Sequence, residues 1–140
     1  MLFYRILVFN LIILVFYSCS SSLSNTDWIG QWEVTSYEVH STRLSSALIE
    51  GAAAEEKSSV YTFHKDGSFL LDVSANREHV KGNWKFDEEA KSIQLVFLYE
   101  EGDSTEDLYQ VERLESGQIK LSQTMGNLGD LEMIIAKKTP

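Results

Sequence analysis

Cysteine and proline are almost absent from this chain. There is one cysteine, Cys19, and one proline, Pro140, in 140 residues. A single cysteine excludes a disulfide within the chain, so packing and hydrogen bonds alone must stabilise the fold. Because the only proline is the last residue, no strand in the body of the chain loses a backbone donor.

Basic residues are also scarce. The chain carries 12 Lys and Arg against 21 Asp and Glu, which gives a formal net charge of −9. Such a surface repels phosphate backbones, so we expect no binding to nucleic acid. The hydrophobic content of 44% and the aromatic content of 11% are too high for a disordered chain. The composition therefore predicts one folded, acidic domain.

No hydrophobic run is long enough to cross a bilayer. The longest apolar stretch, residues 6–17, is interrupted by Asn10 and is shorter than the roughly 20 residues a spanning helix needs. It follows Arg5 and ends just before Cys19, which is the layout of a secretory signal peptide. The serine-rich residues 20–25 that come next are typical of a flexible tether.

The sequence VFYSC at residues 15–19 resembles the lipobox of bacterial lipoproteins, whose cysteine is acylated and becomes the new N-terminus. The alternatives are an ordinary cleaved signal that leaves a free thiol, or an uncleaved anchor helix. A free thiol in an oxidising compartment is prone to oxidation and cross-linking, so we favour lipidation of Cys19. The resemblance implies a protein held on the bilayer in the cell envelope. Ser20, directly after the cysteine, favours the outer membrane, facing the periplasm.

These features divide the chain into three parts. We predict a signal peptide over residues 1–18, an acylated Cys19 with its tether over residues 19–27, and one domain over residues 28–140. From residue 28 onward, short segments of alternating polarity are separated by turn signals, which indicates an all-β domain. The predicted strands cover residues 28–40, 60–65, 68–75, 80–86, 93–99, 108–114, 119–125 and 131–135. Eight sequential antiparallel strands form either a sandwich or a closed barrel, and periodicity does not choose between them.

Two places depart from this regular pattern. The alternation of apolar residues changes phase between Val34 and Tyr37, which predicts a bulge or a bend in the first strand. Residues 41–59 lack strand character and predict either a short helix over residues 44–49 or a mobile loop. Gly51 argues against one long helix in this segment.

The segment Gly30-Gln31-Trp32 resembles the G-x-W motif of lipocalins. The FHKDGSF hairpin, the segment GNWKFD and the closing strand LEMIIAKK resemble the small lipocalin-like domains of bacterial envelope lipoproteins. The resemblance implies a single eight-stranded antiparallel up-and-down barrel, with Trp32 plugging one end. Lipocalins also stack a basic side chain over this tryptophan, and Arg113 is our candidate for it.

Ten large apolar side chains are expected to point into the barrel. They are the candidates for lining a ligand site: Trp32, Phe63, Phe69, Leu71, Trp84, Phe86, Leu95, Phe97, Leu121 and Met133. They either fill the barrel as a solid core or leave part of it as an apolar cavity for one small ligand. We favour a filled base with, at most, a small pocket at the open end.

The polar residues show no catalytic or metal-binding motif. His40, His64 and His79 lack local ligand spacing, so we expect solvated loop histidines and no metal site. The acidic residues of 100–107 have the oxygen ligands that calcium prefers but lack the alternating pattern of a calcium loop, which favours a solvated hairpin. The pairs at 55–56 and 88–89 lie in segments predicted to be exposed. We therefore expect no enzyme and no cofactor.

Three functions remain open at this point. The first is a binding module for a small hydrophobic molecule, anchored through acylated Cys19. The second is an envelope scaffold with a filled barrel, which meets a protein partner through its acidic surface or through residues 41–59. The third, an enzyme, requires a buried histidine or carboxylate in a pocket.

Overall fold

The computed structural model describes residues 22–139. The predicted signal peptide and Cys19 lie outside the described residues. Within residues 22–139, no helix is long and apolar enough to cross a membrane.

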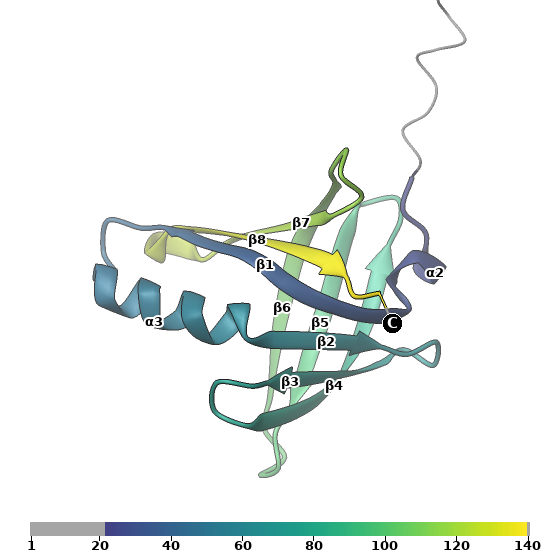
Figure 1. Ribbon diagram of the computed structural model, residues 1–140, viewed down its shortest axis with the longest axis horizontal. Coiled ribbons are helices and arrows are strands. Elements are labelled where there is room, and N and C mark those ends of the chain that lie inside the picture. The colour runs from purple at the N-terminus through teal and green to yellow at the C-terminus, as the bar shows by residue number, and fades with distance from the viewer. Residues whose placement is uncertain (1–21, 140) are drawn as a thin grey trace, which may run out of the picture.

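The described chain forms eight strands, two α-helices and one 3₁₀ turn (Figure 1). In chain order they are α2 (Asn25–Trp28), β1 (Gly30–His40), α3 (Ser46–Lys57), β2 (Ser59–Phe63), β3 (Ser68–Val73), β4 (Glu78–Asp87), β5 (Ser92–Leu98), β6 (Ser104–Arg113), β7 (Ile119–Thr124), η1 (Gly126–Leu128) and β8 (Asp130–Lys137). Each strand pairs antiparallel with the next, and β8 returns to pair with β1. The fold is therefore a closed up-and-down barrel, as predicted, and not a sandwich.

The first strand contains the predicted bulge. Its pairing with β8 shifts register between Val34 and Ser36, which leaves Thr35 without a partner in the ladder. The Thr35 hydroxyl donates a hydrogen bond to the carbonyl of Ile134 at 3.2 Å. The extra residue explains the change of phase in the sequence, because a bulge exchanges the two faces of a strand.

Helix α3 is longer than the sequence indicated. It begins after Ser45, whose hydroxyl caps it by accepting a hydrogen bond from the Leu48 amide at 3.3 Å, and it ends at Lys57. Our expectation that Gly51 prevents a long helix is wrong. The alanines at 52–54 are strong helix formers, and they offset the roughly 1 kcal/mol that a glycine costs in a helix.

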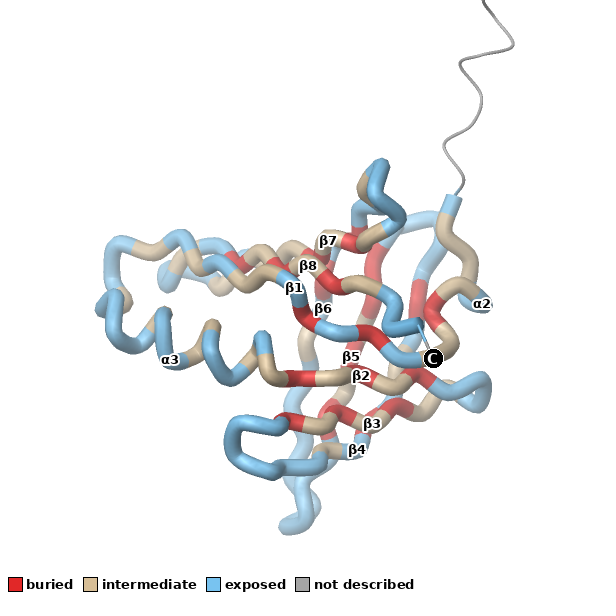
Figure 2. The backbone as a smooth tube through the Cα atoms, in the orientation of Figure 1, coloured by how far each residue is buried: buried red, intermediate tan, exposed pale blue. Residues whose placement is uncertain are grey.

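The barrel interior is a packed apolar core. Nine of the ten side chains predicted to point inward are buried, and the tenth, Trp84, is partly buried and packs against them. The buried positions alternate along the strands, as Figure 2 shows in red. The gap lined by Tyr61, Leu95, Leu121 and Met133, among others, has no room for a water molecule. The base of the barrel is therefore filled.

Trp32 plugs the end of the barrel next to α2, as the resemblance implied. Its indole N–H donates to the carbonyl of Trp28 at 2.8 Å, and the two rings lie 6.0 Å apart. The basic group over the Trp32 ring is Lys137, whose Nζ lies 5.6 Å from the ring centroid. The sequence pointed to Arg113, but Lys137 is opposite Trp32 in the β1–β8 ladder and is brought there by barrel closure.

Gly82 on β4 occupies a position where no side chain fits. A Cβ there would lie 2.3 Å from the carbonyl oxygen of Val96 and 2.4 Å from the Phe69 ring. Gly51 on α3 is the opposite case, since nothing lies within 4 Å of its Cβ position.

These two glycines make a matched test of the fold. We expect Gly82→Ala to lower the free energy of unfolding by about 2–3 kcal/mol, because the barrel wall and the Phe69 ring must move. Gly51→Ala should raise it by about 0.5–1 kcal/mol, because alanine favours the helix. Urea unfolding followed by tryptophan fluorescence measures both. A Gly82→Ala variant as stable as the parent chain would contradict this packing.

Candidate functional site

The two ends of the barrel differ in what covers them. The end near α2 carries the β2–β3, β4–β5 and β6–β7 turns, and Trp28, Phe63 and Phe86 pack together there. The opposite end carries α3 together with the β3–β4, β5–β6 and β7–β8 turns (Figure 1). We call the first the closed end and the second the mouth.

The mouth gathers polar side chains from five elements of the fold. We define the mouth cluster as Tyr37 of β1, Glu56 of α3, Tyr61 of β2, Asp107 and Tyr109 of β6, and Gln123 of β7. Tyr61 and Tyr109 are buried, and the other four are partly buried. Segments far apart in the sequence therefore meet here through barrel closure and the position of α3.

Each carboxylate in the mouth cluster is held by neutral donors. The Tyr61 hydroxyl donates to Oε2 of Glu56 at 3.4 Å. The Tyr109 hydroxyl donates to Oδ2 of Asp107 at 3.4 Å, and the Gln123 amide donates to Oδ1 of the same carboxylate at 3.3 Å. These bonds are long, so both carboxylates keep capacity to accept further hydrogen bonds.

Burial sets the protonation of the cluster. Burial raises the pKa of Glu56, the Tyr61 hydrogen bond opposes this, and the charges of Glu55 and Asp107 add to the increase. The pKa values of Tyr61 and Tyr109 are also raised by burial and by the nearby carboxylates. Both phenols therefore stay protonated at neutral pH and keep their hydrogen-bond donors.

The two carboxylates have no basic partner in the described part of the chain. Within residues 22–139, Lys120 forms an ion pair with Glu112, and the imidazoles of His40 and His79 contact carboxylates, those of Glu38 and Glu132 and that of Asp72. None of them includes Glu56 or Asp107. An anionic, acceptor-rich cluster of this kind suits a ligand that brings a positive charge or several hydrogen-bond donors.

The ten predicted lining residues are distributed between the two ends. Leu121 and Met133 pair across β7 and β8 and lie near the mouth, two residues along their strands from Gln123 and Leu131. Trp32, Phe63 and Phe86 lie at the closed end instead. The mouth cluster thus lies above a layer of packed apolar side chains that includes Leu121 and Met133, which we call the floor.

Two members of the mouth cluster differ from their predicted environment. Glu56 was expected to be exposed like Glu55, but α3 turns it toward Tyr61. Asp107 was expected in a solvated acidic hairpin but is partly buried, whereas Glu100, Glu101, Asp103 and Glu106 are exposed as expected. The period-two alternation of Asp107, Tyr109 and Val111 is the signal that could have placed Asp107 inside.

The histidines also differ from the expected loop residues. His40 is the last residue of β1 and His79 lies in β4, so both are exposed on the outer face of the barrel. His64 lies in the turn after β2, as expected. The imidazole of His79 contacts the carboxylate of Asp72 on β3.

A separate groove of about 280 Å³ opens near the closed end. Leu23, Phe86 and Val111 form its apolar wall, and its charged residues include Lys91 and Arg113. Ser22 and Leu23, which also line it, belong to the segment 19–27 that the sequence predicts to be a tether.

Comparison with known proteins supports the fold. No protein-family model matches this chain, and no curated protein matches it either. A crystal structure of an uncharacterized protein from Bacteroides eggerthii is similar, with a TM-score of 0.52 and 18% identity over 79% of this chain and 99% of that one. A lipocalin-like protein from Bacteroides uniformis has a TM-score of 0.50 and 19% identity over 80% of this chain and 99% of that one. At these identities the similarity establishes a lipocalin-like fold and no specific ligand.

The raised pKa of Glu56 predicts how stability depends on pH. Its folded-state pKa lies above the ordinary value of 4.5, so the folded state holds this proton more tightly than the unfolded state. Glu56 therefore contributes to the free energy of unfolding at low pH, and this contribution is lost as the pH rises from 4.5 through the folded-state pKa.

Glu56→Gln removes this titration. We expect it to raise the free energy of unfolding at pH 8 by about 1 kcal/mol, because a poorly compensated buried charge is lost, and to change it little at pH 4. Urea unfolding at both pH values measures the difference. Glu50→Gln, on an exposed position of the same helix, is the control and should change neither value. Equal effects of the two variants would contradict the assigned environment.

Proposed function

We propose that the protein is a lipid-anchored, non-catalytic binding module of the cell envelope, which holds a small and largely hydrophobic molecule at the mouth of its barrel. One observation carries the proposal: Glu56 and Asp107 converge on the mouth with neutral donors only, above an apolar floor. A lipocalin-like fold is consistent with a binding role.

The chemistry of the mouth cluster specifies the polar part of the ligand. Two carboxylates favour a cationic amine over a carboxylic acid, because an acid adds a third negative charge to a partly buried site. Tyr37 and Val39 of β1, which are only partly buried where they pack against the core, offer apolar contact surface for the rest of the molecule, because Leu121 and Met133 are already buried beneath the cluster. Since the floor has no space for water, we place the ligand on top of the floor and not deep in the barrel.

The residues around the two carboxylates support binding and not catalysis. Tyr61, Tyr109 and Gln123 satisfy the carboxylates as donors. The hydrogen bonds and ion pairs found over residues 22–139 bring no histidine to the mouth cluster. A nucleophile with an adjacent base, which most hydrolytic mechanisms need, is therefore not part of the proposal.

The anchor sets the orientation of the site. Ser22, where the described chain begins, lines the groove at the closed end, and Cys19 precedes it by three residues. An acylated Cys19 thus tethers the barrel by its closed end. On the outer membrane, this arrangement points the mouth away from the bilayer and into the periplasm.

A filled interior favours a second function, that of an envelope scaffold. The packed core needs no ligand for its stability. Helix α3 then offers a surface for a protein partner, since Leu48 is 59% exposed on it. This alternative predicts that the mouth cluster has no preference between cationic and anionic small molecules.

Matched amphiphiles distinguish the two functions. We expect octylamine to bind at least about tenfold more tightly than octanoate, which corresponds to 1.4 kcal/mol of charge preference. Backbone amide shifts in an NMR titration measure both affinities and should change most around Asp107 and Tyr61. Equal binding of the two compounds would overturn the proposed ligand chemistry.

Two double variants serve as the matched pair for that titration. Glu56→Gln with Asp107→Asn should remove the preference for the amine. Glu50→Gln with Glu106→Gln removes the same charge from exposed positions and should preserve the preference.

A separate experiment tests the proposed lipid anchor at Cys19. We expect Cys19→Ala to move the protein from the membrane fraction to the soluble fraction and to abolish metabolic labelling with palmitate, because the acylated thiol is gone. Cell fractionation and labelling measure this. Unchanged membrane association or labelling of the variant would exclude Cys19 as the lipidated residue.

A further inference from the structure

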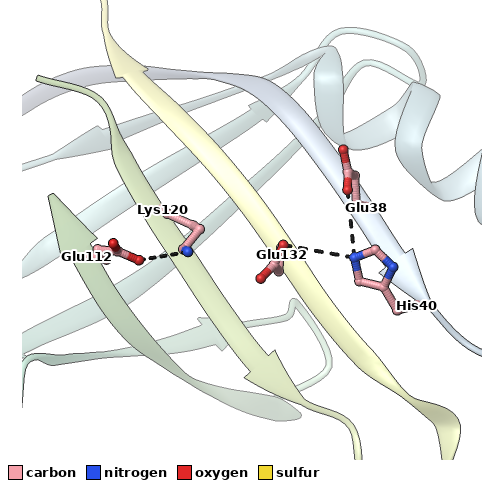
Figure 3. A network of polar contacts seen from close by, with 5 residues as sticks. All are labelled: Glu38, His40, Glu112, Lys120 and Glu132. Carbon is pink, nitrogen blue, oxygen red and sulfur yellow. Dashed lines mark ion pairs between the residues drawn. The ribbon is translucent and has the colours of Figure 1, made fainter. Parts of the chain in front are cut away.

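We propose that Glu38, His40 and Glu132 form a binding site for a divalent transition metal, best matched by Zn²⁺, on the outer face of the barrel. Figure 3 shows its three side chains. They differ in face from the mouth cluster, because Glu38 and His40 alternate along β1 with Tyr37 and Val39, which pack against the core. Nothing in the proposed binding function depends on this site.

The strand geometry brings the three ligands together. Glu38 and His40 are two residues apart on β1, so their side chains leave the same face of the strand. Glu132 on β8 is directly opposite Glu38 in the antiparallel ladder. Two neighbouring ligands on one strand and a third from the adjacent strand therefore face the same point, and all three backbones belong to a closed sheet.

The ligand atoms converge closely enough for one ion. Nε2 of His40 lies 3.7 Å from Oε2 of Glu38 and 3.9 Å from Oε2 of Glu132. One ligand atom from each residue falls within 4.8 Å of the others. Tetrahedral zinc bonds of about 2.0–2.2 Å place ligand atoms about 3.3–3.5 Å apart. Small rotations of these exposed side chains are enough to reach that spacing.

The charges around the site favour a cation. Two carboxylates and a neutral imidazole give a charge that balances a divalent ion. Lys120 lies on the same outer face, but its Nζ is 2.7 Å from Oε2 of Glu112. Glu112 is the main cause of the raised Lys120 pKa and the Glu132 charge a smaller one, and Glu132 contacts His40 at 3.9 Å.

The ligand types and the free space narrow the choice of metal. An imidazole with carboxylates suits zinc, nickel or copper, whereas magnesium and calcium prefer oxygen ligands only. A groove of about 390 Å³ beside the site is lined by His40 and Glu132 together with Ser122, Thr124 and Asp130, and it extends to Gln123 of the mouth cluster. It leaves room for water to complete the coordination sphere.

Isothermal titration of the full-length chain with ZnCl₂ tests the proposal. The protein is prepared in detergent without a polyhistidine tag, since a tag would bind zinc itself. We expect one saturable site per chain, with His40→Ala and Glu132→Gln each weakening the affinity by at least about tenfold. His40 is exposed and Glu132 is partly buried on the outer face, so circular dichroism should show an unchanged fold in both variants.

His79 provides the matched control. It is also exposed on the outer face of a strand and also contacts a carboxylate, that of Asp72, but it belongs to no cluster of three potential ligands among the described residues. His79→Ala should bind zinc as tightly as the parent chain. In histidine side-chain NMR spectra, zinc should shift the His40 ring nitrogens and leave those of His79 unchanged.

Three results at the proposed ligands and their control would overturn the proposal, and a fourth concerns the mouth cluster. The three are the absence of saturable binding up to about 1 mM zinc, a His40→Ala variant that keeps the parent affinity, and an equal loss of affinity in His79→Ala. A loss of binding only in the Glu56→Gln, Asp107→Asn variant would likewise contradict it, because the zinc would then occupy the mouth.

Discussion

The pairing of β1 with β8 is the interaction on which the rest of this structure depends. Strand β1 pairs with β2 over its first residues and with β8 over most of its length, from Trp32 to His40. Closure joins all eight strands into one sheet and gives every strand one inner and one outer face. Beyond Glu33, β1 pairs with β8 alone, and α3 lies along it. Closure also places Lys137 over Trp32 at one end and Glu132 beside Glu38 at the other.

Apolar packing and polar side chains are separated along the barrel axis. Large aromatic rings pack together at the closed end, and apolar side chains fill the barrel interior above them. This half of the barrel therefore stabilises the fold by burying apolar surface and contains no cavity. The mouth combines two carboxylates with phenols and an amide, and the burial that raises the pKa of Glu56 comes at a cost in stability at neutral pH. Ionisable groups with pKa values shifted by burial, such as Glu56, are commonly found at functional sites.

Much of the fold was predictable because it follows from local patterns. Period-two alternation identified eight strands, Asp66-Gly67 marked the tight turn between β2 and β3, and the change of phase in β1 identified its bulge. The length of α3 was underestimated because the expectation considered Gly51 alone and not the alanines that follow it. The mouth cluster was not predicted, since it depends on how α3 lies against the barrel and on which face of β6 carries Asp107.

The sequence by itself determined the all-β class, the order of the strands and the inward apolar side chains, because each of these depends on residues close together in the chain. It also carries a segment that resembles a signal peptide with a lipobox, which predicts acylation of Cys19. Only the tertiary structure decided that the sheet closes, that the base is filled, and that Glu56 meets Tyr61 while His40 meets Glu132. These contacts join distant segments, and their geometry exists only once strand pairing has fixed the register.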